Sequence, residues 1–318
     1  MKKVLITGGT GFIGANFVYK FLELGHEVHL LIREESNFKR IEPIKNKVSL
    51  HSVDLADEQA INKFIGDLKP EIILHFATYG AYPGRQKDVK TMVLTNVLGT
   101  INLLNACAQS GFKCFINTGS SSEYGEKDLP MNEKDLLEPN NQYGVTKATG
   151  TLYAQYLAKK IGLPIATIRL FSPYGYFEED ERLMPSIIRA GLNNGKFSAP
   201  SPSFVRDFTF IEDIMGGYLR AIDNIDSIKG RILNIASGKQ HSIAEVVDAV
   251  EKVSGKKVQV AYGEIAARQH EPKMWVADIS LAKLLLNWSP QYTLESGLRK
   301  YIDWYLKKTN IIKWQSKT

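Results

Sequence analysis

The chain has 318 residues, of which 44% are hydrophobic and 23% charged, which is ordinary for a soluble globular protein. Its length predicts about two domains. The net charge of +6 is concentrated at the end of the chain, because the last twelve residues hold four lysines and no acid and the other 306 residues carry only +2. A basic tail on a nearly neutral body argues against a nucleic-acid partner.

Cys107 and Cys114 have neither the spacing of a disulfide framework nor that of a metal site. We therefore expect two free thiols in a reducing cytoplasm. After Lys2 and Lys3, the apolar run of residues 4–6 is too short for a signal peptide or a membrane span. The expected protein is cytoplasmic, without a membrane partner and without a metal.

The first predicted elements are a strand at residues 4–6, a glycine-rich turn and a helix beginning at Phe12. In such a turn Gly8 takes a positive φ, Gly11 lets the backbone approach a pyrophosphate, and Gly14 lets helix and strand pack closely. The unpaired N–H groups of the helix end would bind the phosphates. The alternative is a turn without a ligand. The predicted dinucleotide contacts here are Gly8, Thr10, Gly11, Phe12, Ile13 and Gly14.

A second strand at residues 25–33 ends in Ile32 and Arg33. An acid at this position would bind both ribose hydroxyls of NAD, and this chain has none. A guanidinium is well suited to a 2′-phosphate, so Arg33 favours NADP(H), with NAD as the alternative. The competing interpretation makes Arg33 a surface residue.

Strands alternate with helices over the next 70 residues. Residues 48–53 form a predicted strand that ends at Asp54 and Leu55, where the carboxylate can accept from the adenine amino group. A helix at 56–65, a strand at 71–75, a long helix at 87–109 bearing Asn96 and a strand at 114–117 follow. His75 is expected to be a packed core residue. This alternation of strands and helices predicts an α/β fold with a Rossmann-type, doubly wound parallel sheet.

The strand at 114–117 runs into a cluster of hydroxyl residues, and Tyr143 opens a helix that extends to about residue 160. Spacing of i, i+4 places Tyr143 and Lys147 on one face of that helix. A phenol titrates near pH 10, and a neighbouring ammonium favours its charged form. Alone, this pair is often surface helix. After a dinucleotide turn and a serine cluster, it predicts an acid/base pair.

With these motifs the chain resembles, over nearly its whole length, the extended short-chain dehydrogenase/reductase family. Within that family it is similar to the nucleotide-sugar epimerases, dehydratases and 4-ketoreductases, including the synthases of CDP-linked dideoxyhexoses. The segments that carry the resemblance are residues 7–14, 54–55, 96–100, Ser120 with Tyr143 and Lys147, 169–175 and 205–208.

The resemblance implies a catalytic role for Ser120, Tyr143 and Lys147. Tyr143 would be the general acid/base, Lys147 would hold the nicotinamide ribose and tune Tyr143, and Ser120 would hydrogen-bond the reacting sugar oxygen. It further implies cofactor contacts at Phe76, Ala77 and Asn96. The substrate contacts that it implies, together with those expected from the loops, are Tyr79, Ser121, Ser122, Ser172, Arg206 and Arg268.

Two departures from the family pattern bear on the reaction. Dehydratases place Asp-Glu directly after the catalytic Thr, whereas this chain has Ser121 and Ser122, with Glu123 one residue late. A hydroxyl cannot replace those carboxylates, so a 4,6-dehydratase is disfavoured. Ser172 stands where many relatives have Asn, which puts one substrate-phosphate contact in doubt.

The remaining sequence predicts helices at 183–192, 213–222, 243–253 and 294–306, strands at 205–211 and 231–235, and a short helix from about 278. We expect an NADP(H)-binding domain at residues 1–170 and about 205–237. A smaller mixed α/β substrate domain would comprise residues 171–204 and 238–318. In the family, helices matching 87–109 and 141–160 often form a four-helix dimer interface, so we expect a homodimer.

The expected reaction follows from the cofactor. A reductase consumes a fresh nicotinamide in each turnover and commonly uses NADPH, whereas an epimerase regenerates tightly held NAD. Arg33 therefore favours NADPH-dependent reduction of the C4 keto group of a nucleoside-diphosphate 4-keto-6-deoxy sugar, for surface polysaccharide. The alternative is an NAD(P)-dependent nucleotide-sugar 4-epimerase. A dehydratase and a catalytically silent NADP-binding regulator are less favoured.

Overall fold

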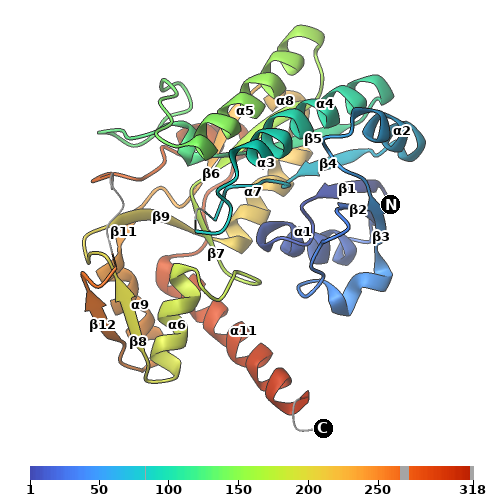
Figure 1. The fold of residues 1–318 in the computed structure, drawn as a ribbon. Helices are drawn as coiled ribbons and strands as arrows, with labels where there is room; N and C mark the ends of the chain where they lie inside the picture. Colours follow the sequence, from blue (N-terminus) through green and yellow to red (C-terminus); the bar gives the residue numbers. More distant parts are fainter. Residues whose placement is uncertain (83, 266–271, 316–318) are drawn as a thin grey trace.

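The computed structural model describes residues 1–82, 84–265 and 272–315, with side chains described to residue 307. In the described part, the main sheet has seven strands in the order β10-β6-β5-β4-β1-β2-β3 (Figure 1). Every neighbouring pair in it is parallel, which confirms the doubly wound sheet. The strands are β1 (Lys3–Thr7), β2 (Glu27–Ile32), β3 (Ser49–Ser52), β4 (Ile72–His75), β5 (Cys114–Ser120), β6 (Ile165–Leu170) and β10 (Ile232–Ile235).

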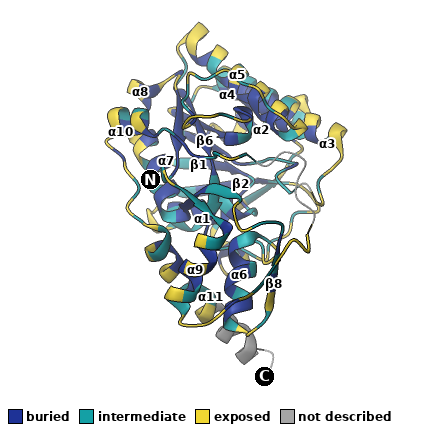
Figure 2. Ribbon diagram, turned by 90° about the vertical axis from the view of Figure 1, so that its left-hand side faces the viewer, coloured by how far each residue is buried: buried dark blue, intermediate teal, exposed yellow. Residues whose placement is uncertain are grey.

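Helices cover both faces of this sheet (Figures 1 and 2). Successive side chains of a strand point to opposite faces, so Val4 and Ile6 of β1 join one apolar cluster and Leu5 joins another. The first cluster includes helices α1 (Phe12–Glu23) and α7 (Ile211–Asp223). The second includes α2 (Glu58–Leu68), α4 (Gly99–Ser110) and α5 (Gln142–Ile161). Burial on both sides explains why the central strands are continuous apolar runs.

A smaller mixed α/β part lies beyond the carboxyl edge of the main sheet (Figure 1). In it, β9 (Val205–Phe210) pairs in parallel with β7 (Ser172–Tyr174) and antiparallel with β11 (Gln240–Ser242). A second, parallel pair joins β8 (Lys196–Ala199) to β12 (Gln259–Tyr262). Besides α7, the described helices of this half of the chain are α6 (Leu183–Leu192), α8 (Ile225–Ile228), α9 (Ile243–Ser254), α10 (Ser280–Leu286) and α11 (Leu294–Gln315). The expected smaller mixed part is confirmed, and the domain boundaries stay a prediction.

The predicted long helix at 87–109 runs from Val89 to Ser110, and it contains a π-helical segment that the pattern did not predict. α3 (Val89–Val93) passes into the π-helical segment Leu94–Leu98 and then into α4. By length and composition this helix could cross a membrane, but half of its apolar window is buried inside the fold. A single such helix is weak evidence, because the core helix of a soluble protein passes the same test.

The two cysteines are free and buried. Burial raises the pKa of the Cys114 thiol to about 12. Both thiols therefore act as small apolar side chains of the core.

Candidate active site

The glycine-rich turn joins β1 to α1 and has no room for side chains at two of its glycines. Gly8 has a φ of 70°, and a Cβ on it would lie 2.7 Å from the backbone nitrogen of Ala77. A Cβ on Gly14 would lie 2.2 Å from the carbonyl oxygen of Gly8. No side chain caps the first turn of α1. Its N–H groups can therefore bind an anion, and the turn fits a dinucleotide pyrophosphate.

The other predicted cofactor residues of this edge follow β3 and β4. Asp54 is exposed, and its carboxylate accepts a hydrogen bond from the Ala56 N–H at 2.9 Å. Leu55 is buried, and the Phe76 ring packs on the Phe17 ring with centroids 4.7 Å apart. These residues lie at the carboxyl ends of the strands, where ligands bind in such sheets.

Two cations of the loop after β2, Arg33 and Arg40, are paired with carboxylates. The Arg33 side chain is 57% exposed, and its guanidinium lies 3.2 Å from the Glu35 carboxylate. Arg40, on the same loop, forms an ion pair with Glu179 at 2.5 Å. A carboxylate beside each guanidinium weakens its attraction for a phosphate.

His75 is buried and hydrogen-bonded, as expected from the sequence. Its ring nitrogens lie 2.7 Å from the Thr7 hydroxyl and 2.9 Å from the Thr100 hydroxyl. Burial, together with the smaller effect of the Lys147 charge, lowers the pKa of His75 to about 3. The ring is therefore neutral at physiological pH and ties β4 to its neighbours.

Ser120 ends β5, and the 3-10 turn Ser121–Glu123 follows directly. The Ser120 hydroxyl accepts from the Ser122 N–H at 3.1 Å, and Glu123 Oε1 accepts from the Ser120 N–H at 2.8 Å. Glu123 is fully buried, and its Oε2 accepts from Arg169 Nε at 2.8 Å. Thr151 of α5 also donates to Oε1, at 3.0 Å. Both carboxylate oxygens of Glu123 are therefore committed to the protein.

The start of α5 brings the Tyr143 phenol to the serine turn. The Tyr143 phenol lies close enough to the Thr78 and Ser120 side chains for both of them to lower its pKa. Gly144 allows this approach, since a Cβ on it would lie 2.2 Å from the carbonyl oxygen of Ser122. Burial raises the pKa of Tyr143, and these two side chains oppose that rise. Ser120 and Tyr143 thus meet at one point of the carboxyl edge.

Lys147 lies one helical turn beyond Tyr143 and is 6% exposed. Burial lowers its pKa to about 8, and the negative charge of Glu123 opposes the shift. The ammonium makes no hydrogen bond to any other residue that the structure describes. A buried donor without a protein partner fits the ribose hydroxyls of a dinucleotide, which would supply acceptors.

Asn96 lies in the π-helical segment and joins the loop after β4 to α5. Its Oδ1 accepts from the Tyr79 N–H at 2.8 Å and from the Thr78 hydroxyl at 3.1 Å. Its Nδ2 donates to the Tyr79 carbonyl at 2.7 Å and to the Thr146 hydroxyl at 3.0 Å. The amide is fully used within the protein, so Asn96 holds the loop that presents Thr78 to Tyr143. The sequence analysis missed Thr78 and Thr146, and the small-residue turn after β4 was the available signal.

The predicted substrate residues lie on several different elements. Tyr79 follows Thr78, Ser121 and Ser122 follow Ser120, and Ser172 begins β7 just beyond the end of β6. Arg206 lies in the smaller part, on β9, with its guanidinium 5.5 Å from the centre of the Trp275 ring. Arg268 lies outside the described residues.

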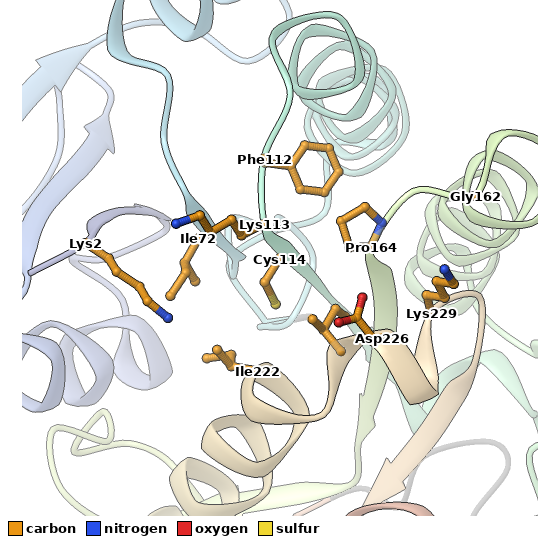
Figure 3. Close-up of a pocket in the computed structure, with 11 residues that line it drawn as sticks. Lys2, Ile72, Phe112, Lys113, Cys114, Gly162, Pro164, Ile222, Asp226 and Lys229 are labelled. Carbon is orange, nitrogen blue, oxygen red and sulfur yellow. The ribbon is translucent and has the colours of Figure 1, made fainter.

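A separate cavity lies at the opposite, amino edge of the sheet (Figure 3). It is lined by residues at the starts of strands, such as Ile72 and Cys114, and by Lys2, Lys113 and Lys229. Helices α4 and α5 end at this edge, and cations near helix carboxyl termini stabilise the helix dipole. The lysines thus have a structural explanation, and the cavity is remote from Ser120 and Tyr143.

Comparison with known proteins places relatives along the whole chain. The model of the NAD dependent epimerase/dehydratase family matches residues 4–236. UDP-glucose 4-epimerase 2 of Arabidopsis thaliana is 27% identical over 337 residues, covering 95% of this chain and 95% of that protein. UDP-glucose 4-epimerase of Lactobacillus helveticus is 27% identical over 310 residues, covering 91% and 92%. The crystal structure of UDP-glucuronic acid 4-epimerase from Bacillus cereus with UDP-glucuronic acid and NAD has a TM-score of 0.85 at 29% identity, covering 96% and 99%.

Replacing Arg169 with Met tests the buried ion pair. The change leaves the Glu123 carboxylate buried without a cation, so the free energy of unfolding should fall by about 3–5 kcal/mol in urea titrations. Adding Glu123→Gln should recover most of that loss. Lys63→Met is the control, because it removes only an exposed pair with Asp67 and should leave the midpoint unchanged. A small effect of Arg169→Met would contradict the structural role of the pair.

Lys147→Met tests the desolvated ammonium in the cofactor-free protein. The pKa of Lys147 is lowered from 10.5 to about 8, so folding around the charged form costs on the order of 3 kcal/mol at pH 7. That cost is present below pH 8 and disappears as the pH rises from 8 toward 10.5. The variant should therefore be more stable than the wild type at pH 7, with a difference that narrows by pH 10. A difference that is independent of pH would contradict the assignment.

Proposed function

Because the chain belongs to the NAD dependent epimerase/dehydratase family, we propose that it is an NAD-dependent 4-epimerase of a nucleoside-diphosphate sugar. The observation that carries the proposal is the meeting of Tyr143 with Ser120 and Thr78, beside the buried ammonium of Lys147. Relatives named as UDP-glucose and UDP-glucuronic acid 4-epimerases match nearly the full chain, which favours a UDP-sugar as substrate.

The environment of Arg33 does not support a preference for NADPH. The reductase, which was inferred from that preference, is therefore not supported either. That guanidinium is mostly exposed and paired with Glu35, and Arg40 is held by Glu179. The Bacillus cereus structure contains NAD, which agrees with this view of the loop after β2. We therefore favour NAD and the epimerase over NADPH and the 4-ketoreductase.

A 4,6-dehydratase needs a carboxylate acid and base next to the catalytic hydroxyl. Ser121 and Ser122 occupy those positions, and Glu123 is turned into the protein toward Arg169. Water elimination across C5 and C6 therefore lacks its proton carriers, whereas epimerisation at C4 requires only one acid/base.

Tyr143, Ser120 and Lys147 have different roles in the proposed epimerisation. Bound NAD would supply the acceptor and donor of the C4 hydride. Tyr143 takes the proton of the C4 hydroxyl and returns it once the hydride has been restored on the opposite face. Ser120 donates a hydrogen bond to the C4 oxygen. The Lys147 ammonium would hold the ribose of the dinucleotide. The positive charge that opposes the burial-induced rise in the pKa of Tyr143 is that of Arg182.

We further propose a homodimer formed through the helix Val89–Ser110 and α5. Both carry exposed apolar side chains, and on α5 Val145, Leu152 and Tyr156 recur at helical spacing, each about half exposed. On the first helix Val93, Leu94 and Leu98 are exposed. Contiguous apolar surface of this kind is typical of a protein interface. The free thiols favour a cytoplasmic location.

Tyr143→Phe tests the mechanism. Loss of the phenol should lower kcat for UDP-sugar epimerisation about 10²–10⁴-fold while the purified protein still contains NAD. The assay follows UDP-glucose and UDP-glucuronic acid by NMR without added cofactor.

Tyr153→Phe is the matched control, since its hydroxyl lies on the same helix but bonds Asn105 at 2.8 Å, away from the site. It should keep wild-type turnover. Full activity of Tyr143→Phe would refute the acid/base assignment, and a strict need for added NADPH would favour the reductase.

A further inference from the structure

Arg40 connects the dinucleotide-binding loops to the segment after β7. Its Nε donates to the carbonyl of Phe177 at 2.7 Å, and its Nη1 to the carbonyl of Thr10 in the glycine-rich turn at 3.4 Å. Its Nη2 lies 2.5 Å from the Glu179 carboxylate. The two paired side chains are only 21% and 18% exposed, so water screens the pair less than an exposed one. One side chain thus ties the turn after β1, the loop after β2 and the segment after β7 together.

Glu179 extends this connection to the loop beside Tyr143. Its second carboxylate oxygen accepts a hydrogen bond from the Tyr82 hydroxyl, on the loop after β4. The same loop contains Gly80, where a Cβ would lie 3.2 Å from the Tyr143 ring. Glu179 therefore bridges the loop expected at the adenosine end and the loop beside the acid/base.

The segment that carries Glu179 is held in place by contacts with α1. Asn16 of α1 donates to the Tyr176 carbonyl at 2.8 Å, and the Phe177 ring stacks on Tyr19 with centroids 5.1 Å apart. Phe177 has a φ of 67°, a left-handed conformation that costs a bulky residue energy and persists only where its surroundings impose it. These contacts fix the segment against α1, next to the turn that fits the pyrophosphate.

We propose that the Arg40–Glu179 pair, supported by Tyr82, closes over the dinucleotide and sets how long the cofactor stays bound. The inference rests on the proposed function, because an epimerase regenerates its cofactor in every turnover and has no need to release it. Release requires the loops after β2, β4 and β7 to separate, and the pair joins all three. Arg40, Glu179 and Tyr82 are positioning residues in this account and do not touch the reacting atoms.

The test is the rate at which bound NAD⁺ leaves the full-length protein. Protein loaded with radiolabelled NAD⁺ is chased with excess unlabelled NAD⁺, for the wild type, Glu179→Gln and Arg40→Met. Each variant should release label at least tenfold faster than the wild type. Arg85→Ala is the matched control, because Arg85 and Glu181 join the loops after β4 and β7 at 3.3 Å but are 63% and 70% exposed. It should release label at the wild-type rate.

Tyr82→Phe removes one hydroxyl only and is the conservative second variant. It should speed release by a smaller factor and keep the wild-type unfolding temperature. Release from all variants at the wild-type rate would overturn the closure and leave the proposed function standing. Failure of the wild type to bind any nicotinamide dinucleotide would overturn the proposed function and the closure together.

Discussion

The buried ion pair between Glu123 and Arg169 is the constraint on which the site depends. Two charges taken out of water are tolerable only when each satisfies the other, and both side chains are at most 1% exposed. Glu123 receives the Ser120 N–H from β5 and the Thr151 hydroxyl from α5, and Arg169 comes from β6. The pair therefore fixes Ser120 relative to the helix that carries Tyr143 and Lys147.

The same carboxylate affects the acid/base chemistry. Its negative charge favours the protonated forms of both Lys147 and Tyr143, which retains the ammonium in a desolvated position and raises the pKa of the phenol. The side chains of Thr78 and Ser120 lower that pKa and so favour the phenolate. Glu123 therefore opposes loss of the phenol proton, whereas Thr78, which hydrogen-bonds Asn96, favours it.

The alternation of strands and helices predicted the parallel sheet, and local patterns predicted the glycine turn and the shared helical face of Tyr143 and Lys147. The position of Ser120 beside Tyr143 was implied by the family resemblance. The features that the patterns missed are visible only in the folded chain. The spacing of Glu123 shows nothing of Arg169, which lies 46 residues away. The spacing of apolar residues does not predict the π-helical segment at Leu94–Leu98. The NADPH hypothesis followed from the identity of Arg33, whereas the pairing with Glu35 emerges only from the folded loop.

The central claim is that one hydride leaves C4 of the sugar and returns to the same carbon. The most direct measurement is turnover of a UDP-sugar deuterated at C4, with purified protein and no added cofactor, followed by NMR of both C4 epimers. We expect the product epimer to retain deuterium at C4, with no hydrogen from the solvent incorporated at that carbon. Loss of the label from C4, or product that forms only as added NADPH is oxidised, would contradict it.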